Sequence, residues 1–152
     1  MNFENPKDAF NAGAVLALEA RTITKDEIIE FAEEFDPAFF HIDETAAKSS
    51  MLGGLVASGF HTCSILMRMI CDSYLTRSTS QGAPEVVEIN WLHPVRPGDT
   101  LSGQTTVLEG RQSASKPDLW ISRLKHELAN QDKLPVLSMT VVVLFKIPQA
   151  TL

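Results

Sequence analysis

The segment at residues 60–74 constrains the fold most, because it has the pattern of a helix whose apolar side chains surround most of its circumference. A helix that is apolar nearly all round is normally enclosed by other parts of the protein. Its apolar residues are Phe60, Cys63, Ile65, Leu66, Met67, Met69 and Ile70. We therefore expect the rest of the chain to supply a surface that wraps around this helix.

Four segments after this helix have the pattern of long strands. Val87, Ile89 and Trp91 alternate with polar residues, which is the period of a strand with one buried face. The polar connections between the last three segments have the lengths of hairpin loops. We expect an antiparallel sheet, before which an apolar run at residues 14–20 forms a first strand or an extended lead-in. The predicted strands are residues 85–91, 101–108, 119–128 and 136–145.

A shorter helix is expected between Thr24 and Asp36. Thr24 and Glu27 have the spacing of a capping box, in which the hydroxyl and the carboxylate each bind the other residue's backbone amide. Pro37 disfavours helical geometry at Asp36, so the helix should end there. Its buried face is predicted from the helical spacing of Ile28, Phe31, Ala32 and Phe35.

A carboxylate and an imidazole follow the end of the shorter helix. Asp36 and His41 are five positions apart in a segment that turns at Pro37, so their side chains can converge on one site. Aspartate is ionised at neutral pH, whereas histidine changes its protonation state near neutrality. Such a pair can exchange protons with one water molecule, and this segment is therefore the best candidate for chemistry.

Composition limits the classes of protein and partner. A chain of 152 residues is expected to form one domain with a real core. No apolar run approaches the roughly 20 residues of a membrane-spanning helix, and the first residues lack the pattern of a secretory signal. The net charge of −6, without a basic cluster, argues against a nucleic-acid partner. We expect a cytoplasmic protein with no membrane partner.

Two pairs of residues are expected to be structural. Glu44 and Lys48 lie four positions apart in a short helix or loop at residues 42–51, and the prediction pairs them on the surface. Cys63 and Cys71 are eight positions apart on one predicted helix, which is too far for a disulfide. We expect both cysteines to be core thiols.

Metal binding and serine nucleophiles are less favoured interpretations. Asp36, His41 and Asp43 have no second histidine or cysteine group at ligand spacing, so no metal site is predicted. Ser58 and Ser64 lack a paired base in the sequence. The remaining histidines are expected to be hydrogen-bonded structural residues, namely His61, His93 and His126.

Three segments together resemble the MaoC-like acyl dehydratases, the hot-dog-fold family that includes the (R)-specific enoyl-CoA hydratases. The first has Asp36 and His41 five positions apart, followed by the acidic Asp43 two positions beyond the histidine. The second, residues 56–60, has Gly59 at the start of the predicted central helix. The third, residues 91–101, has an aromatic residue followed by the pattern Pro-Val-x-x-Gly-Asp-x-Leu. The similarity extends from about residue 3 to residue 148.

This resemblance implies an α+β hot-dog fold over residues 1–152, in which a curved antiparallel sheet wraps around the central apolar helix. It also implies a homodimer, because a single sheet of this kind leaves an edge strand unpaired and edges are usually covered.

The resemblance further implies a hydro-lyase that adds or removes water at the 2,3 position of an acyl thioester. Asp36 and His41 would hold one water and divide the proton transfers. The backbone N–H of Gly59 would stabilise the thioester oxygen. The substrate would be carried by coenzyme A or by acyl carrier protein, and no further cofactor is implied.

Two departures from the family motif bear on the substrate. Ala38 and Phe39 stand where Asn-Pro is commoner, and Ser58 replaces the histidine that usually precedes the glycine. We assign substrate binding to Phe40 and Ser58. Phe39 and Phe40 either pack in the core or line an acyl tunnel.

Two other functions stay open at this point. One is a thioesterase of the same fold, in which Asp36 activates water against the thioester carbonyl. The other is a subunit that binds acyl thioesters without catalysis. Arg96 and Arg123 are expected on the solvated surface, and contact with the phosphates of CoA is the less favoured interpretation.

Overall fold

The computed structural model describes residues 1–149, so the end of the expected domain, residues 150–152, lies outside the described residues. The elements, in chain order, are α1 (Pro6–Ala9), β1 (Val15–Thr22), α2 (Lys25–Phe35), α3 (Phe39–Ile42), α4 (Glu44–Ala47), α5 (Gly59–Ser73), the 3₁₀ helix η1 (Leu75–Arg77), β2 (Ser80–Trp91), β3 (Thr100–Gln112), β4 (Leu119–Ala129) and β5 (Pro135–Lys146).

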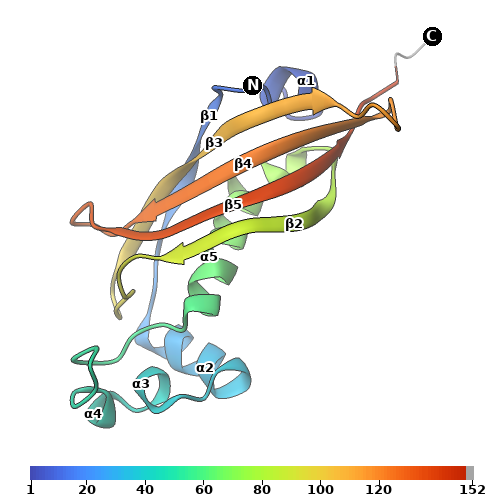
Figure 1. Ribbon diagram of the computed structural model, residues 1–152. Coiled ribbons are helices and arrows are strands. Elements are labelled where there is room, and N and C mark those ends of the chain that lie inside the picture. The colour runs from blue at the N-terminus through green and yellow to red at the C-terminus, as the bar shows by residue number, and fades with distance from the viewer. Residues whose placement is uncertain (150–152) are drawn as a thin grey trace.

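The five strands form one antiparallel sheet in the order β1-β3-β4-β5-β2. The sheet arches across α5, while α2, α3 and α4 form a separate group beyond the N-terminal end of α5 (Figure 1). This is the hot-dog arrangement, and it confirms the predicted sheet around a central helix. Within residues 1–149, no helix is long and apolar enough to cross a membrane.

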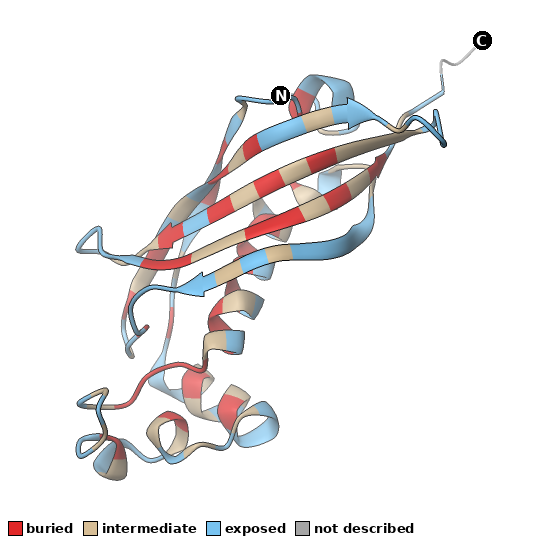
Figure 2. Cartoon of the chain, viewed as in Figure 1, coloured by how far each residue is buried: buried red, intermediate tan, exposed pale blue. Residues whose placement is uncertain are grey.

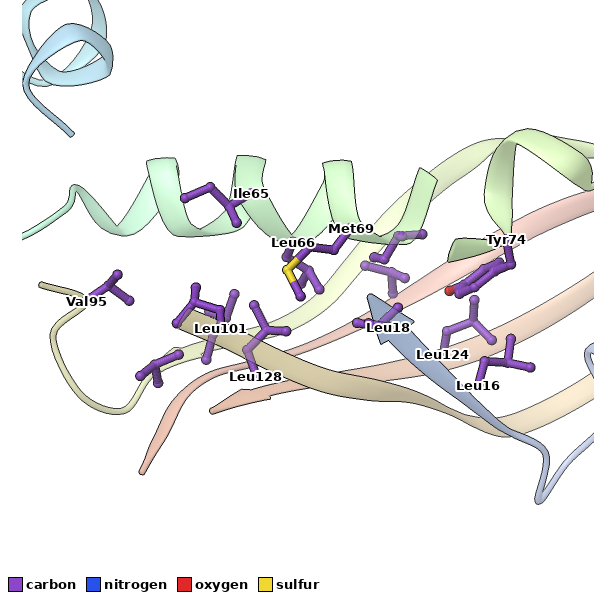
Figure 3. Close-up of a cluster of buried hydrophobic side chains, with 14 of the residues drawn as sticks. Leu16, Leu18, Ile65, Leu66, Met69, Tyr74, Val95, Leu101, Leu124 and Leu128 are labelled. Carbon is purple, nitrogen blue, oxygen red and sulfur yellow. The ribbon is translucent and has the colours of Figure 1, made fainter. Parts of the chain in front are cut away.

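Alternation along the strands builds the core. In β4, every second residue from Ser122 to Leu128 is buried, and these residues face the helix side of the sheet. Ile65, Leu66 and Met69 of α5 lie above the inward residues of the strands (Figure 3). The edge strand β2 is exposed over most of its length, because β5 alone pairs with it (Figure 2).

The prediction that α5 is enclosed all round is wrong. Phe60 is 65% exposed and Met67 is 43% exposed, since the sheet covers one flank of the helix. Cys63 and Cys71 are free thiols that are half-buried rather than central to the core. Burial still raises the pKa of the Cys63 thiol.

Two smaller predictions near α2 are also wrong. Phe35 is 66% exposed: it is the last residue of α2, and the buried residues of this helix are Ile28 and Ala32. Glu44 pairs with Lys25 at 3.2 Å rather than with Lys48. The Lys48 amide donates to the Thr45 carbonyl at 3.3 Å rather than to that of Glu44, so the last turn is tighter than an α-helix and Lys48 does not lie directly above Glu44.

Candidate active site

The end of α2 positions Asp36. The helix begins with the predicted capping box, in which the Glu27 amide donates to the Thr24 hydroxyl and the Thr24 amide donates to the Glu27 carboxylate. It ends at Phe35, and the Asp36 amide donates the last helical bond to Ala32 at 2.9 Å. Asp36 therefore leaves the helix as its C-cap, with its side chain partly open to solvent.

His41 lies in the single turn α3, and its ring is almost completely buried. Its Nδ1 lies 2.7 Å from the carbonyl oxygen of Val56. Because a carbonyl oxygen can only accept, Nδ1 must carry the hydrogen of this bond. The other ring nitrogen, Nε2, lies 3.3 Å from Oδ2 of Asp36. When the ring is neutral, Nε2 therefore holds the lone pair beside the carboxylate.

Ser58 connects the carboxylate to the central helix. It is the N-cap of α5, but its hydroxyl does not cap the helix; it donates to Oδ2 of Asp36 at 2.7 Å. A hydroxyl that donates to a carboxylate makes a short, charge-assisted bond that fixes the acceptor's position. Oδ1 of Asp36 accepts no hydrogen bond within the described part of the chain, so it is left for a ligand or water.

Gly59 is the first residue of α5. A Cβ atom here would lie 2.6 Å from Nε1 of Trp91, so any other residue at this position would require the indole to move. That indole N–H donates to the Gly59 carbonyl at 2.8 Å. The Gly59 N–H belongs to the first turn of the helix, where backbone donors have no partner within the helix and the positive end of the helix dipole lies.

One cavity of about 460 Å³ joins these groups. Asp36, His41 and Gly59 all lie in its wall, as the sequence prediction requires of a shared site. Ser58 and Phe40 are not among the lining residues. Ser58 is fully buried against Asp36, and Phe40 packs edge-on against the His41 ring at a centroid distance of 4.5 Å.

The same cavity contains residues that sequence reasoning did not assign to the site. Thr62 lines it from α5, and residues 91–95 line it from the end of β2 and the following turn. Within that turn, Nδ1–H of His93 donates to the Pro135 carbonyl at 2.7 Å, which leaves its Nε2 available. The sequence signal for these residues is the third family-like segment, residues 91–101, which by itself assigns no side chain of the turn to the site.

Asp43 does not join the pair. Its Oδ1 accepts from the Ala46 amide at 3.0 Å, so the carboxylate is the N-cap of α4. Among the described residues, no group of three His, Cys, Asp or Glu side chains could hold a metal ion. The Arg96 guanidinium donates to the Leu52 carbonyl, which braces the loop at one wall of the cavity.

Two of the other histidines are hydrogen-bonded as predicted, and one is not. His93 and His126 each make a hydrogen bond through Nδ1. The prediction for His61 is wrong: its buried Nδ1 has no hydrogen-bond partner in residues 1–149, and its ring stacks on that of Phe31 at a centroid distance of 4.5 Å. Desolvation lowers the pKa of His61.

A family model described as "MaoC like domain" matches residues 10–127. The chain belongs to the MaoC-like family. It is 37% identical to a MaoC-like dehydratase from Rhodospirillum rubrum, with a TM-score of 0.80 over 93% of this chain and 97% of that one. It is 28% identical to the uncharacterized protein YdeM of Bacillus subtilis, over 91% of this chain and 97% of that protein.

An R-hydratase from Pseudomonas aeruginosa shares the fold of this MaoC-like chain. Its TM-score is 0.70 at 17% identity, over 93% of this chain and 89% of that one. At this identity the likeness concerns the fold alone. The family match and the 37% identity to the Rhodospirillum rubrum protein support an activity of the dehydratase kind.

Proposed function

We propose that this protein is a hydro-lyase that adds water to, or removes it from, the 2,3 position of an acyl thioester. The observation that carries the proposal is the approach of His41 Nε2 to Asp36 Oδ2, 3.3 Å apart in the wall of a cavity that Gly59 also lines. The 37% identity to a protein named as a MaoC-like dehydratase supports the same reaction class.

In the hydration direction, the proposed mechanism starts with one water between Asp36 and His41. Oδ1 of Asp36 orients the water, and the lone pair on His41 Nε2 accepts its proton as the oxygen bonds to C3. The C2–C3 π electrons move toward the thioester carbonyl, where the Gly59 N–H stabilises the enolate oxygen. The proton then passes from His41 to C2, which restores the neutral imidazole and the thioester.

Each supporting contact has a role in this mechanism. The Val56 carbonyl holds the hydrogen on His41 Nδ1, so the basic lone pair stays on Nε2. The Ser58 hydroxyl holds Asp36 Oδ2, and the carboxylate stabilises the imidazolium that forms beside it. Ser58 and Phe40 thereby act by positioning Asp36 and His41, while the substrate meets Thr62 and residues 91–95.

A homodimer remains part of the proposal. Phe60, Met67, Val86, Trp91 and Leu92 are exposed large apolar residues of α5, β2 and the residue after it. The unpaired edge of β2 runs beside them, and natural proteins usually cover such edges. Sedimentation should give twice the chain mass of 16.7 kDa, and a monomer at micromolar concentration would contradict this part.

The test of the function is steady-state hydration of crotonyl-CoA, followed by loss of the conjugated-enoyl absorbance. Asp36→Asn removes the charge that orients the water and stabilises the imidazolium of His41, so the acid–base step should lose about 10²–10⁴-fold in kcat. Asp43→Asn is the matched control, because asparagine can still cap α4 and Asp43 lies outside the cavity.

Three results would contradict the proposal. Equal turnover by Asp36→Asn and Asp43→Asn would remove Asp36 from the chemistry. Release of free CoA thiol would indicate a thioesterase, since hydration leaves the thioester intact. Binding of crotonyl-CoA by the wild type without turnover would indicate a subunit that binds acyl thioesters without catalysis.

A further inference from the structure

The indole of Trp91 joins the edge of the sheet to the first turn of α5. Trp91 is the last residue of β2, which ends near the start of α5 (Figure 1), and it pairs there with Leu137 of β5. It also lines the cavity that contains Asp36. Its Nε1–H donates to the Gly59 carbonyl at 2.8 Å. No step of the proposed mechanism uses this bond.

Two contacts show that the indole is packed closely against this turn. The ring of Phe60 lies edge-on to that of Trp91, at a centroid distance of 5.5 Å and an interplanar angle of 68°. A Cβ atom at Gly59 would lie 2.6 Å from Nε1 and 2.8 Å from Cε2 of the indole. Both distances are well inside the van der Waals contact of about 3.5 Å. The indole therefore occupies the space that a side chain at position 59 would fill.

The carbonyl that accepts this bond belongs to the peptide between Gly59 and Phe60, so the amide hydrogen of the same peptide is the Phe60 N–H. The two groups point in opposite directions, because the peptide is trans. Within residues 1–149, neither the Phe60 N–H nor the Gly59 N–H makes a hydrogen bond. The N-cap residue Ser58 leaves both unbonded, since its hydroxyl binds Asp36 instead.

A donor bound to the carbonyl of a peptide polarises that peptide and strengthens its N–H as a donor, by about 10–30% per bond. The positive end of the α5 dipole acts in the same direction. At a thioester oxygen, this gain is largest when negative charge develops, because preorganised donors stabilise a charged oxygen more than a neutral one. The bond from Trp91 should therefore affect the transition state more than the binding of substrate.

We propose that Trp91 is a positioning residue whose indole holds and polarises the Gly59–Phe60 peptide, so that the Phe60 N–H acts together with the Gly59 N–H on the thioester oxygen. The inference rests on the proposed function for the position of that oxygen. Gly59 and Phe60 are the first two residues of α5 and both line the cavity, so their N–H groups leave the same end of the helix. Trp91 acts on the reaction through this peptide.

The test measures carbonyl polarisation without turnover, from the infrared stretch of butanoyl-CoA labelled with ¹³C at the thioester carbonyl. This saturated thioester has no double bond to hydrate, and stronger hydrogen bonds to its oxygen lower the stretching frequency. The wild type should move the band below its position in water. Trp91→Phe keeps an aromatic ring beside Phe60 but has no N–H, so it should lose part of this shift while the affinity for butanoyl-CoA is unchanged.

The same variant should separate kcat from KM in the hydration of crotonyl-CoA. Loss of a whole oxyanion donor costs about 10²–10³-fold in kcat, whereas Trp91→Phe only weakens one donor. We expect kcat to fall about 3–10-fold with KM nearly unchanged, because the weakened interaction belongs to the transition state. A role of Trp91 in packing alone would move KM and the affinity for butanoyl-CoA and would leave the band in place.

Trp120→Phe is the matched control. The Trp120 indole also donates to a backbone carbonyl, that of Phe10 at 3.0 Å, and Trp120 lies outside the cavity. This variant loses the same kind of bond and should keep the wild-type band and kcat. Gly59→Ala breaks the Trp91 bond from its other side, since it retains an N–H but places a Cβ where the indole lies. Its effect on the band and that of Trp91→Phe should therefore not add in the double variant.

The same band in the wild type and Trp91→Phe would overturn the inference, and so would an equal loss of shift in Trp91→Phe and Trp120→Phe. A wild type that does not bind butanoyl-CoA would overturn it as well. Should Trp91→Phe not fold, the band in Gly59→Ala decides.

The proposed function fails separately. A wild type that does not hydrate crotonyl-CoA, but whose band shift depends on Trp91, would retain the role of Trp91 and reject the hydro-lyase. An active wild type whose band is the same as that of Trp91→Phe would retain the hydro-lyase and reject the role of Trp91.

Discussion

His41 and His126 are both almost fully buried and both bonded through Nδ1, yet the structure gives them opposite properties. The Nδ1 of His41 faces a carbonyl oxygen, which can only accept, so this nitrogen carries the hydrogen and Nε2 is left basic. The Nδ1 of His126 lies 2.8 Å from Thr105 Oγ1, which is 3.0 Å from the Tyr74 hydroxyl. A buried donor without an acceptor is costly, so Tyr74 donates to Thr105 and Thr105 donates its own hydrogen to Nδ1. The Nδ1 of His126 therefore accepts, and its Nε2 carries the hydrogen.

The surroundings of the two Nε2 atoms also differ. His41 Nε2 lies 3.3 Å from a carboxylate that is partly open to solvent, an arrangement suited to moving a proton. His126 Nε2 belongs to a ring in an apolar cavity, where burial depresses the pKa and the ring stays neutral. The partner of Nδ1 therefore decides whether a buried histidine serves as a base or as a neutral donor.

The largest expected effect comes from a substitution that removes the base but keeps the hydrogen bond to the Val56 carbonyl. In His41→Asn, the side-chain amide can still donate to the Val56 carbonyl, but nothing remains at the Nε2 position. We predict that kcat for crotonyl-CoA falls about 10²–10⁴-fold while the thermal unfolding temperature changes little. A variant with wild-type kcat would show that Nε2 of His41 is not the base.

The pH dependence of stability should report the neutral state of His126. Its folded pKa, about 4, lies below the ordinary value of 6.5, so the unfolded chain takes up a proton first as the pH falls. The stabilisation is fully present above about pH 6.5 and is lost progressively toward pH 4, and at pH 5 the loss should be about 2 kcal/mol. The lowered pKa of His61 acts in the same direction.

Urea unfolding at pH 7 and pH 5 measures this loss. The glutamine of His126→Gln cannot take up a proton. The free energy of unfolding of this variant should therefore fall less between pH 7 and pH 5 than that of the wild type. An equal fall in the two proteins would mean that His126 is not held neutral in the folded state.

Much of the fold follows from local sequence. The capping box at Thr24, the end of α2 at Asp36 and the alternation in the long strands each depend on residues a few positions apart. The same holds for Asp36 and His41, which converge because the chain turns at Pro37. The place of Gly59 beside them does not follow from local sequence, because it depends on how α5 packs against α2.

The missed features depend on contacts that are distant in the chain. Thr105 and His126 are cross-strand partners in β3 and β4, and Tyr74 reaches them from the end of α5. The strand pattern shows that both strand residues face inward, but not that they are neighbours. Likewise, the periodicity of α5 shows that Phe60 is apolar, but it does not show that the sheet leaves this flank open.

The claim that the Nδ1 partner sets the role of each imidazole can be tested by one ¹⁵N NMR measurement of histidine tautomers, made at a pH where both rings are neutral. The account predicts the Nδ1–H tautomer for His41 and the Nε2–H tautomer for His126, with the His126 signal altered in Thr105→Val, which lacks the donating hydroxyl. The same tautomer for both rings, or the reverse assignment, would contradict it.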